Sequence, residues 1–321
     1  MSSAHIRFLA TWRVLSSAIV QALSLSWIAG YLLRHRLTPM AFVYVNARVP
    51  TGIDPSQSKY KFFKAIESKD PKLAALYPRA LFISANVPYC ERLIVAQKFM
   101  TENAIAYPLV GKPDTGSRSI GAYRIEGEVG LSHLLERITT DYLIEEYCLG
   151  PLEFGLYFVR SPDHDHPSQF GIAIKRDSYI ATSAPHPELV PLLTHFLIED
   201  QTAQLSPELQ RVVEQVADAV PFDMGRLDVR APSLERLLND PMCMRILEIN
   251  AGFDAADLHA TDLRHSFGTR FQMTLDKWNY ALRLGNGYYE AEHQKVGLYA
   301  YAVQYIRYGL FLGALDTDMY R

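Results

Sequence analysis

Hydrophobic and polar positions follow two different periods along this chain. After Ser206-Pro207, a good N-cap followed by a good first helical residue, apolar residues recur at helical spacing. Short apolar runs, such as 142–146 and 154–160, are typical of strands. Because helices and strands mix without strict alternation, the pattern predicts an α+β fold. Further helices are expected at 61–66, 89–103, 129–138 and 265–284, and further strands at 40–46, 107–111, 169–175, 224–229 and 244–249.

Residues 14–33 contain no charged residue, and a helix of this length could span a bilayer. Several serines dilute the stretch, and Trp27 and Tyr31 are residue types that favour the membrane interface. Two alternatives remain open: a helix that contacts a membrane, spanning it or lying in the interface, and an apolar helix packed on the folded body. Arg34 and Arg36 favour a cytoplasmic body if the helix inserts.

The overall composition is that of a globular protein, with 49% hydrophobic and 21% charged residues in 321 positions. A net charge of −3 gives the chain no basic footprint for nucleic acid. Three cysteines lie far apart without a CxxC spacing, which argues against a disulfide framework and a zinc site and fits a reducing compartment. His164 and His166 stand in a polar turn, where a solvated loop is the favoured interpretation.

Lys112 ends an expected strand and precedes a loop of small residues that contains Gly116, Ser117, Ser119 and Gly121. Small residues let backbone N–H groups approach phosphate oxygens closely, and a neighbouring lysine can clamp the phosphate. Taken alone, a solvated turn is the favoured interpretation of this loop.

A group of polar residues, Glu145, Glu146, Tyr147 and Glu153, adjoins the two expected strands at 142–146 and 154–160. A hinge at this point could bind adenine through its backbone and ribose hydroxyls through a carboxylate. The alternative is a set of exposed glutamates at strand ends.

Two later strands carry the most specific pattern. Arg226, Asp228 and Arg230 are spaced two apart and share one face, as Glu248 and Asn250 do on the next strand. Oxygen ligands of this kind suit Mg²⁺ if the two strands are neighbours. The arginines would offset the carboxylate charge and hold phosphate or carboxylate, which makes both candidate catalytic residues. A surface ladder of salt bridges is the alternative.

These motifs in this order resemble the ATP-grasp superfamily, and more narrowly the ligases similar to D-alanine–D-alanine ligase. The matching text runs from 107 to 250, nearly half the chain, and looks closest to a ligase-like group of unassigned substrate. The resemblance implies a fold of two α+β lobes that grip ATP, preceded by an apolar N-terminal helix. It also implies domains at 1–45, 46–105, 106–290 (with lobes at 106–168 and 169–290) and 291–321.

The resemblance further implies a role for each matching residue. Lys112 and Lys175 would contact ATP, with the loop 116–121 as a lid. Glu145 and the backbone around Glu146 and Tyr147 would hold adenine, and Glu153 would hold the ribose. Arg226 would stabilise developing charge. The Mg²⁺ ligands would be Asp228, Glu248 and Asn250.

The implied reaction is ATP-dependent activation of a small-molecule carboxylate as an acyl phosphate, followed by attack of an amine or related nucleophile. The alternatives are an ATP-binding module without ligase activity and an ATP-grasp kinase. The chain departs from the family in three respects: the region between Lys175 and Phe222 is short, the N-terminal 100 residues do not resemble the usual α/β lobe, and the usual first-lobe lysine has no clear equivalent. Lys98 is the nearest candidate for that lysine. ATP chemistry indicates a cytoplasmic enzyme, and the apolar stretches at 14–33 and 296–315 suggest contact with the inner face of the membrane.

Overall fold

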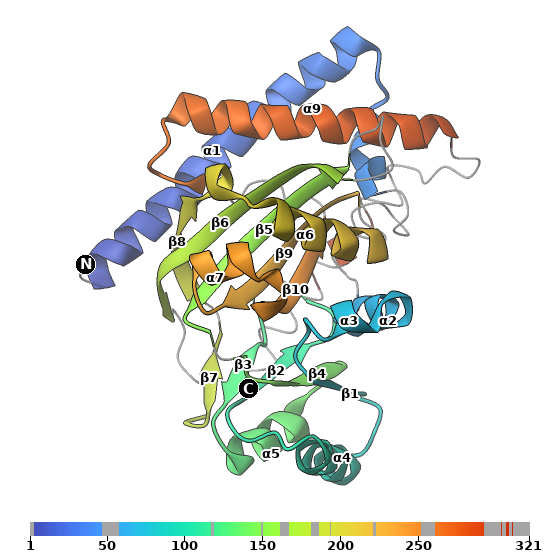
Figure 1. Ribbon diagram of the computed structural model, residues 1–321, viewed down its shortest axis with the longest axis vertical. Helices are drawn as coiled ribbons and strands as arrows, with labels where there is room; N and C mark the ends of the chain where they lie inside the picture. The colour runs from blue at the N-terminus through green and yellow to red at the C-terminus, as the bar shows by residue number, and fades with distance from the viewer. Residues whose placement is uncertain are drawn as a thin grey trace.

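Two five-stranded antiparallel sheets form the centre of the computed structural model, and helices flank both of them (Figure 1). The first sheet has the order β1-β4-β2-β3-β7, and the second has the order β10-β9-β5-β6-β8. An α+β fold is therefore confirmed. The structure describes residues 3–46, 58–116, 119–148, 150–160, 167–180, 186–192, 194–220, 223–251, 261–291, 303, 306, 307 and 310.

The elements have the following bounds. The strands are β1 Ala80–Ile83, β2 Leu109–Pro113, β3 Tyr123–Ile125, β4 Tyr142–Glu146, β5 Leu152–Arg160, β6 Pro167–Ile180, β7 Leu189–Pro191, β8 Thr194–Asp200, β9 Met224–Ala231 and β10 Arg245–Ala251. The helices are α1 Ser3–His35, α2 Lys59–Lys69, α3 Pro71–Ala74, α4 Tyr89–Glu102, α5 Glu128–Arg137, α6 Pro207–Ala219, α7 Leu234–Asn239 and α9 Phe267–Ala291, with 3-10 helices η1 Pro39–Asn46, η2 Thr202–Gln204 and η3 Pro241–Cys243.

Each face of the second sheet has its own apolar core. Phe154 and Leu227 point to the face covered by α2, α6 and α7, where both side chains are fully buried. Tyr157 and Met224 point to the opposite face and pack with Trp278 of α9. Because side chains alternate along a strand, α9 covers the face that also carries the polar residues of β9.

The strand pairing within the first sheet crosses the domain ranges expected from the sequence. β1 lies in the range 46–105 but pairs with β4, and β7 lies in the range 169–290 but pairs with β3. Both strands are only three or four residues long. Strands this short give little periodic signal, so the sequence pattern did not predict them.

The run at 40–46, expected as a strand, is part of the 3-10 helix η1, so that prediction was wrong. A short apolar run has no period long enough to separate helix from strand, and burial decides between them. η1 packs closely on α9 at Gly285, where a Cβ atom would stand 1.9 Å from the carbonyl oxygen of Ala41. The missing side chain of Gly285 is what allows this contact.

The N-terminal helix α1 packs along α9 and the edge of the second sheet (Figure 1). Val20 and Ile28 are buried there, and Arg270 of α9 donates a 3.0 Å hydrogen bond to the hydroxyl of Ser16. One face of α1 therefore packs on the folded body. Among the helices in the described ranges, none is both long enough and apolar enough to cross a membrane. Most of 296–315 lies outside the described residues, as do His164 and His166.

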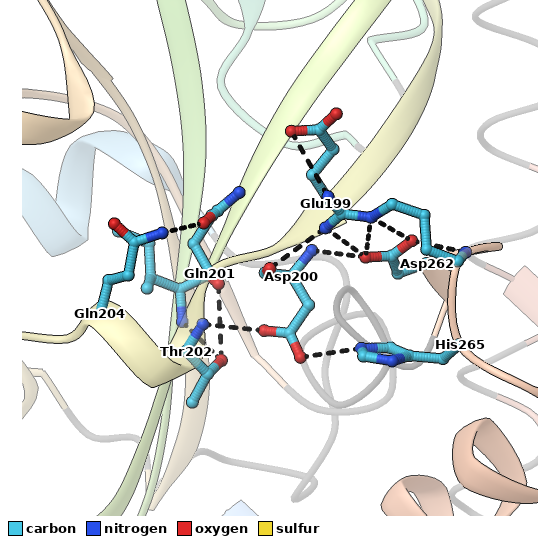
Figure 2. Close-up of polar contacts among 9 residues, drawn as sticks. Glu199, Asp200, Gln201, Thr202, Gln204, Asp262 and His265 are labelled. Carbon is cyan, nitrogen blue, oxygen red and sulfur yellow. Dashed lines mark hydrogen bonds and ion pairs between the residues drawn. The ribbon is translucent and has the colours of Figure 1, made fainter.

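A network of charged residues ties the end of β8 to the start of α9 (Figure 2). We call it the clasp, and its members are Asp200, Asp262, Arg264 and His265. Asp262 is fully buried and accepts 2.8 Å hydrogen bonds from the backbone N–H groups of Asp200 and Arg264. His265 contacts the carboxylate of Asp200 at 3.1 Å. The clasp therefore fixes where α9, and with it α1, meets the second sheet.

Candidate active site

The polar faces of β9 and β10 lie side by side, which meets the condition that the sequence analysis set for a shared group of oxygen ligands. The two strands pair antiparallel, with Asp228 opposite Glu248 and Arg226 opposite Asn250. Leu227 and Val229, which alternate with the charged residues of β9, are fully buried in the core on the other face. The strand period therefore brings two carboxylates, an amide and a guanidinium to one surface.

Asp228 is the best-connected carboxylate of this surface. Arg226 donates to both of its oxygens, at 2.8 and 3.0 Å, and Asn250 donates to Oδ2 at 3.0 Å. Burial alone would raise the pKa of Asp228, but the positive charges of Arg226 and Lys175 outweigh it and lower the pKa to about 2. Asp228 is therefore a fully charged carboxylate near neutral pH.

Lys175 of β6 joins Asp228 to Glu153 of β5. Its ammonium lies 3.4 Å from Asp228 Oδ2 and hydrogen-bonds the Glu153 carboxylate. Burial opposes the charge on Lys175, but the two carboxylates outweigh it and raise the pKa of the lysine. Glu153, which the sequence analysis assigned to ribose binding, and Lys175, which it assigned to ATP contact, are thus direct partners in the fold.

Lys112 and Glu145 form a second buried pair, on neighbouring strands β2 and β4. The Lys112 ammonium lies 2.8 Å from Glu145 Oε2 and donates a 2.7 Å hydrogen bond to the carbonyl oxygen of Leu247 on β10. Burial raises the pKa of Glu145, and the lysine offsets only part of this effect. Lys112 therefore bridges the first sheet and the second.

Lys59, at the start of α2, is the site residue that the sequence analysis missed. Its ammonium lies 3.4 Å from Glu248 Oε1 and donates a 2.8 Å hydrogen bond to the carbonyl of Gly116. The only signal was the Ser58-Lys59 pair, in which Ser58 caps α2 and turns the next residue inward. Lys98, the candidate first-lobe lysine, instead extends from α4 with a 68% exposed side chain and pairs with Glu102.

The loop after Lys112 is held at both ends. The carbonyl and the side chain of Asp114 accept hydrogen bonds from the backbone N–H groups of Lys59 and Tyr60, at 3.0 and 2.9 Å. Ser119 and Gly121 adopt positive φ values of 56° and 72°. A left-handed backbone suits glycine, which explains the residue type at position 121. Ser117 lies outside the described residues.

A small pocket connects these groups. Lys59, Lys112, Glu145 and Glu248 line one side of it, and aromatic and aliphatic side chains complete the wall. The apolar lining consists of Tyr60, Phe62, Phe63, Tyr77, Pro78, Ala80, Leu143, Leu247 and Ile249. Lys175 and Glu153 are not among the lining residues; they continue the polar surface along β5 and β6. We refer to the charged residues that these contacts connect as the site cluster. Its members are Lys59, Lys112, Glu145, Glu153, Lys175, Arg226, Asp228 and Glu248.

Three predicted residues lie outside the site cluster. Glu146 points to the opposite side of β4 and pairs with Arg79 at 3.0 Å. The Tyr147 ring is flanked by Arg230, whose guanidinium lies 5.2 Å from the ring centroid. Arg230 also donates a 3.1 Å hydrogen bond to the carbonyl of Cys148. Arg230 thus supports the segment after β4, and its position on β9 lies opposite Glu153 of β5.

The donor set of β9 and β10 fits a hard divalent cation. Asp228 and Glu248 supply carboxylate oxygens at opposing positions, and Asn250 supplies an amide within hydrogen-bond distance of Asp228. In the part of the chain that the structure describes, no group of three histidine, cysteine, aspartate or glutamate side chains could hold a metal ion. The set proposed for Mg²⁺ differs from such groups because one of its three ligands is an asparagine.

Comparison with known proteins gives matches at the level of structure. No family model matches the chain, and no curated protein sequence matches it. The solved structures similar to it include a D-Ala:D-Ser ligase from Enterococcus faecalis, with 16% identity and a TM-score of 0.47 over 71% of this chain and 61% of that one. A D-alanine–D-alanine ligase from Bacillus anthracis, in complex with ATP, gives 15% identity and a TM-score of 0.47 over 80% and 75%.

A third similar structure is a D-cycloserine synthetase, with 14% identity and a TM-score of 0.45 over 72% of this chain and 71% of that one. The chain thus spans about 61% of the length of the first of these proteins. Ligases like D-alanine–D-alanine ligase, which the sequence motifs resemble, are among the structures to which this chain is similar.

Proposed function

We propose that this chain is an ATP- and Mg²⁺-dependent ligase of the ATP-grasp type, which activates a small-molecule carboxylate for attack by an amine. The observation that carries the proposal is the site cluster. Lys59, Lys112 and Lys175, which come from three separate regions of the chain, meet the carboxylates of β4, β5, β9 and β10. A triphosphate needs several cations in one place, and the cluster supplies them.

The lysines are suited to bind a phosphate oxygen as an additional partner. An ammonium has three N–H donors, and within the described residues Lys112 uses two of them, for Glu145 and for the Leu247 carbonyl. The remaining donor can reach a phosphate oxygen while the pair with Glu145 stays intact. The aromatic lining of the pocket offers flat apolar surface on which a purine base can stack.

The proposed chemistry has two steps. A carboxylate oxygen of the substrate attacks the γ-phosphorus of ATP, and ADP leaves, so that an acyl phosphate forms. The amine nitrogen then attacks the acyl carbon, phosphate leaves with the bonding electrons, and the nitrogen loses a proton. Arg226 would balance the negative charge that develops in both steps. Asp228, Glu248 and Asn250 would hold Mg²⁺, which supplies charge neutralisation of the triphosphate.

The test is release of ADP in the presence of pooled carboxylates and amines, including amino acids, peptides and cell-envelope precursors. A ligase releases ADP only when both an acid and an amine are present. Phosphorylated product without an amine would indicate a kinase, and tight ATP binding without turnover would indicate a binding module. The proposal places the enzyme in the cytoplasm, where ATP is available.

A matched pair of lysine variants checks that the activity belongs to this site. Lys112→Ala removes a cation of the pocket, and Lys98→Ala removes an exposed lysine of α4. We expect Lys112→Ala to weaken ATP binding by at least about tenfold, because a charge-assisted contact to phosphate is lost. Equal ATP affinity of the two variants, measured by calorimetry, would contradict the assignment.

A further inference from the structure

The outward face of α1 is unusually apolar. Phe8, Trp12, Leu15, Ile19 and Leu23 are between 44% and 66% exposed. Their spacing of three or four residues places them on one side of the helix, where they form a continuous line that we call the α1 stripe. Neighbouring large apolar side chains exposed together are typical of a contact surface.

The inward face of α1 is, by contrast, partly polar. Ser16 and Ser24 are buried beside Val20 and Ile28. Ser24 donates a 2.7 Å hydrogen bond to the carbonyl of Val20, and Ser16 accepts one from Arg270. α1 therefore packs on α9 through the buried serines and through a cluster that includes Ile28, while the large apolar side chains of the α1 stripe face outward.

The charge around α1 indicates what kind of surface it meets. Residues 1–53 contain five arginines and no aspartate, glutamate or lysine, a formal charge of +5. The whole chain carries −3, so the remaining residues carry −8. Arg34, His35 and Arg36 are exposed at the end of the helix. An apolar stripe on a basic segment complements an anionic lipid surface, and the acidic body would face away from it.

We propose that the α1 stripe docks on the surface of an anionic lipid bilayer, with the helix in the plane of the interface. Trp12 and the aliphatic side chains enter the boundary between headgroups and acyl chains, and the arginines lie near the lipid phosphates. A second copy of the chain is a poorer occupant of the stripe. Two copies of α1 would bring arginines together in either orientation, with no acidic residue in 1–53 to offset them.

The test uses the full chain and two kinds of vesicle, one of phosphatidylcholine alone and one containing phosphatidylglycerol. We expect flotation with the anionic vesicles, weaker flotation with the neutral ones, and a blue shift of tryptophan emission that Trp12→Phe removes. Leu15→Gln/Ile19→Gln should lower the vesicle partition coefficient by roughly tenfold or more, because two apolar contacts with the bilayer are lost. Both side chains are about half exposed, so the fold tolerates the change.

The control is Ile94→Gln/Val129→Gln, which removes two exposed apolar side chains from α4 and α5 and should leave partitioning unchanged. Absence of flotation with anionic vesicles at low salt would overturn the proposal, as would equal loss in the two double variants. Sedimentation velocity tests whether a second copy of the chain occupies the α1 stripe. A dimer that Leu15→Gln/Ile19→Gln converts to a monomer, together with no vesicle binding, would assign the stripe to a second copy. ADP release is measured separately, so failure here leaves the proposed reaction unaffected.

Discussion

The clasp and the site cluster use the same types of residue but hold their charges differently. In the clasp, the Asp262 carboxylate accepts hydrogen bonds from the backbone N–H groups of Asp200 and Arg264. The Asp200 carboxylate accepts one from the backbone N–H of Thr202. In the site cluster, Asp228 accepts from the side chains of Arg226 and Asn250. Backbone donors cannot move away without local unfolding, whereas long side chains can change partners.

This difference separates a structural charge network from one suited to binding. Lysine carries its ammonium on a flexible four-carbon stem with three N–H donors, so Lys59, Lys112 and Lys175 can turn a donor toward a phosphate oxygen. In the clasp, by contrast, Asp262 accepts a hydrogen bond from a backbone N–H group 62 positions away, which fixes how the two segments meet. We therefore expect changes in the site cluster to affect turnover and changes in the clasp to affect stability.

The largest effect is expected from Glu248→Gln. Glu248 lies opposite Asp228 and is 3.4 Å from Lys59, so the change removes a ligand charge of the proposed metal site. We expect ADP release to fall by at least roughly 100-fold. The melting temperature should change by less than about 2 °C, because the side chain is 27% exposed and only one ion pair is lost. Turnover near the wild-type rate would exclude Glu248 as a ligand.

A change in the clasp should instead lower the stability of the fold. Asp262→Ala leaves the backbone N–H groups of Asp200 and Arg264 without their acceptor, which we expect to lower the free energy of unfolding by about 2–3 kcal/mol. Urea titration measures this loss. The matched control is Asp276→Ala on α9, where an exposed contact with Gln272 is lost and the change should stay within about 0.5 kcal/mol. Equal stability of the two variants would show that the clasp does not fix α9.

The dependence of the unfolding free energy on pH in the acid range should show how Asp262 contributes to stability. Burial opposes the charge on Asp262, but hydrogen bonds from Arg264 and the backbone outweigh it and lower the pKa of this carboxyl below its ordinary value of 3.8. A lowered pKa contributes stability above about pH 4, and this contribution is lost as the pH falls through the folded-state value. The difference in unfolding free energy between wild type and Asp262→Ala should therefore narrow below about pH 4. A constant difference down to pH 2.5 would contradict this origin.

The smallest effect concerns Lys59, which the sequence analysis did not select. Lys59→Ala removes one of several cations, so we expect ATP affinity to fall by about tenfold, without a change in melting temperature. Lys61→Ala, two positions away on the exposed side of α2, should bind ATP as the wild type does. If both variants bind ATP equally, Lys59 is a structural partner of Glu248 and not a phosphate ligand.

The sequence by itself determined the features that depend on local period and capping. Strands β9 and β10 follow from the alternation of charged and apolar residues, and α6 begins where Ser206 accepts a hydrogen bond from Leu209. Each of these signals lies within a few neighbouring residues. The motifs also predicted that Lys112, Lys175 and Asp228 belong to one polar site, and in the structure the ammonium of Lys175 lies 3.4 Å from the Asp228 carboxylate.

Only the tertiary structure decided which distant residues meet. Lys112 contacts the carbonyl of Leu247, which is 135 positions away, and Lys59 contacts Glu248 across a still longer stretch of the chain. No period or cap encodes such a contact, because it depends on how the two sheets lie against each other. The faces of α1 were decided in the same way. Residues 14–33 contain no charged residue that would mark a solvent-facing side, so packing against α9 determines which side remains exposed as the α1 stripe.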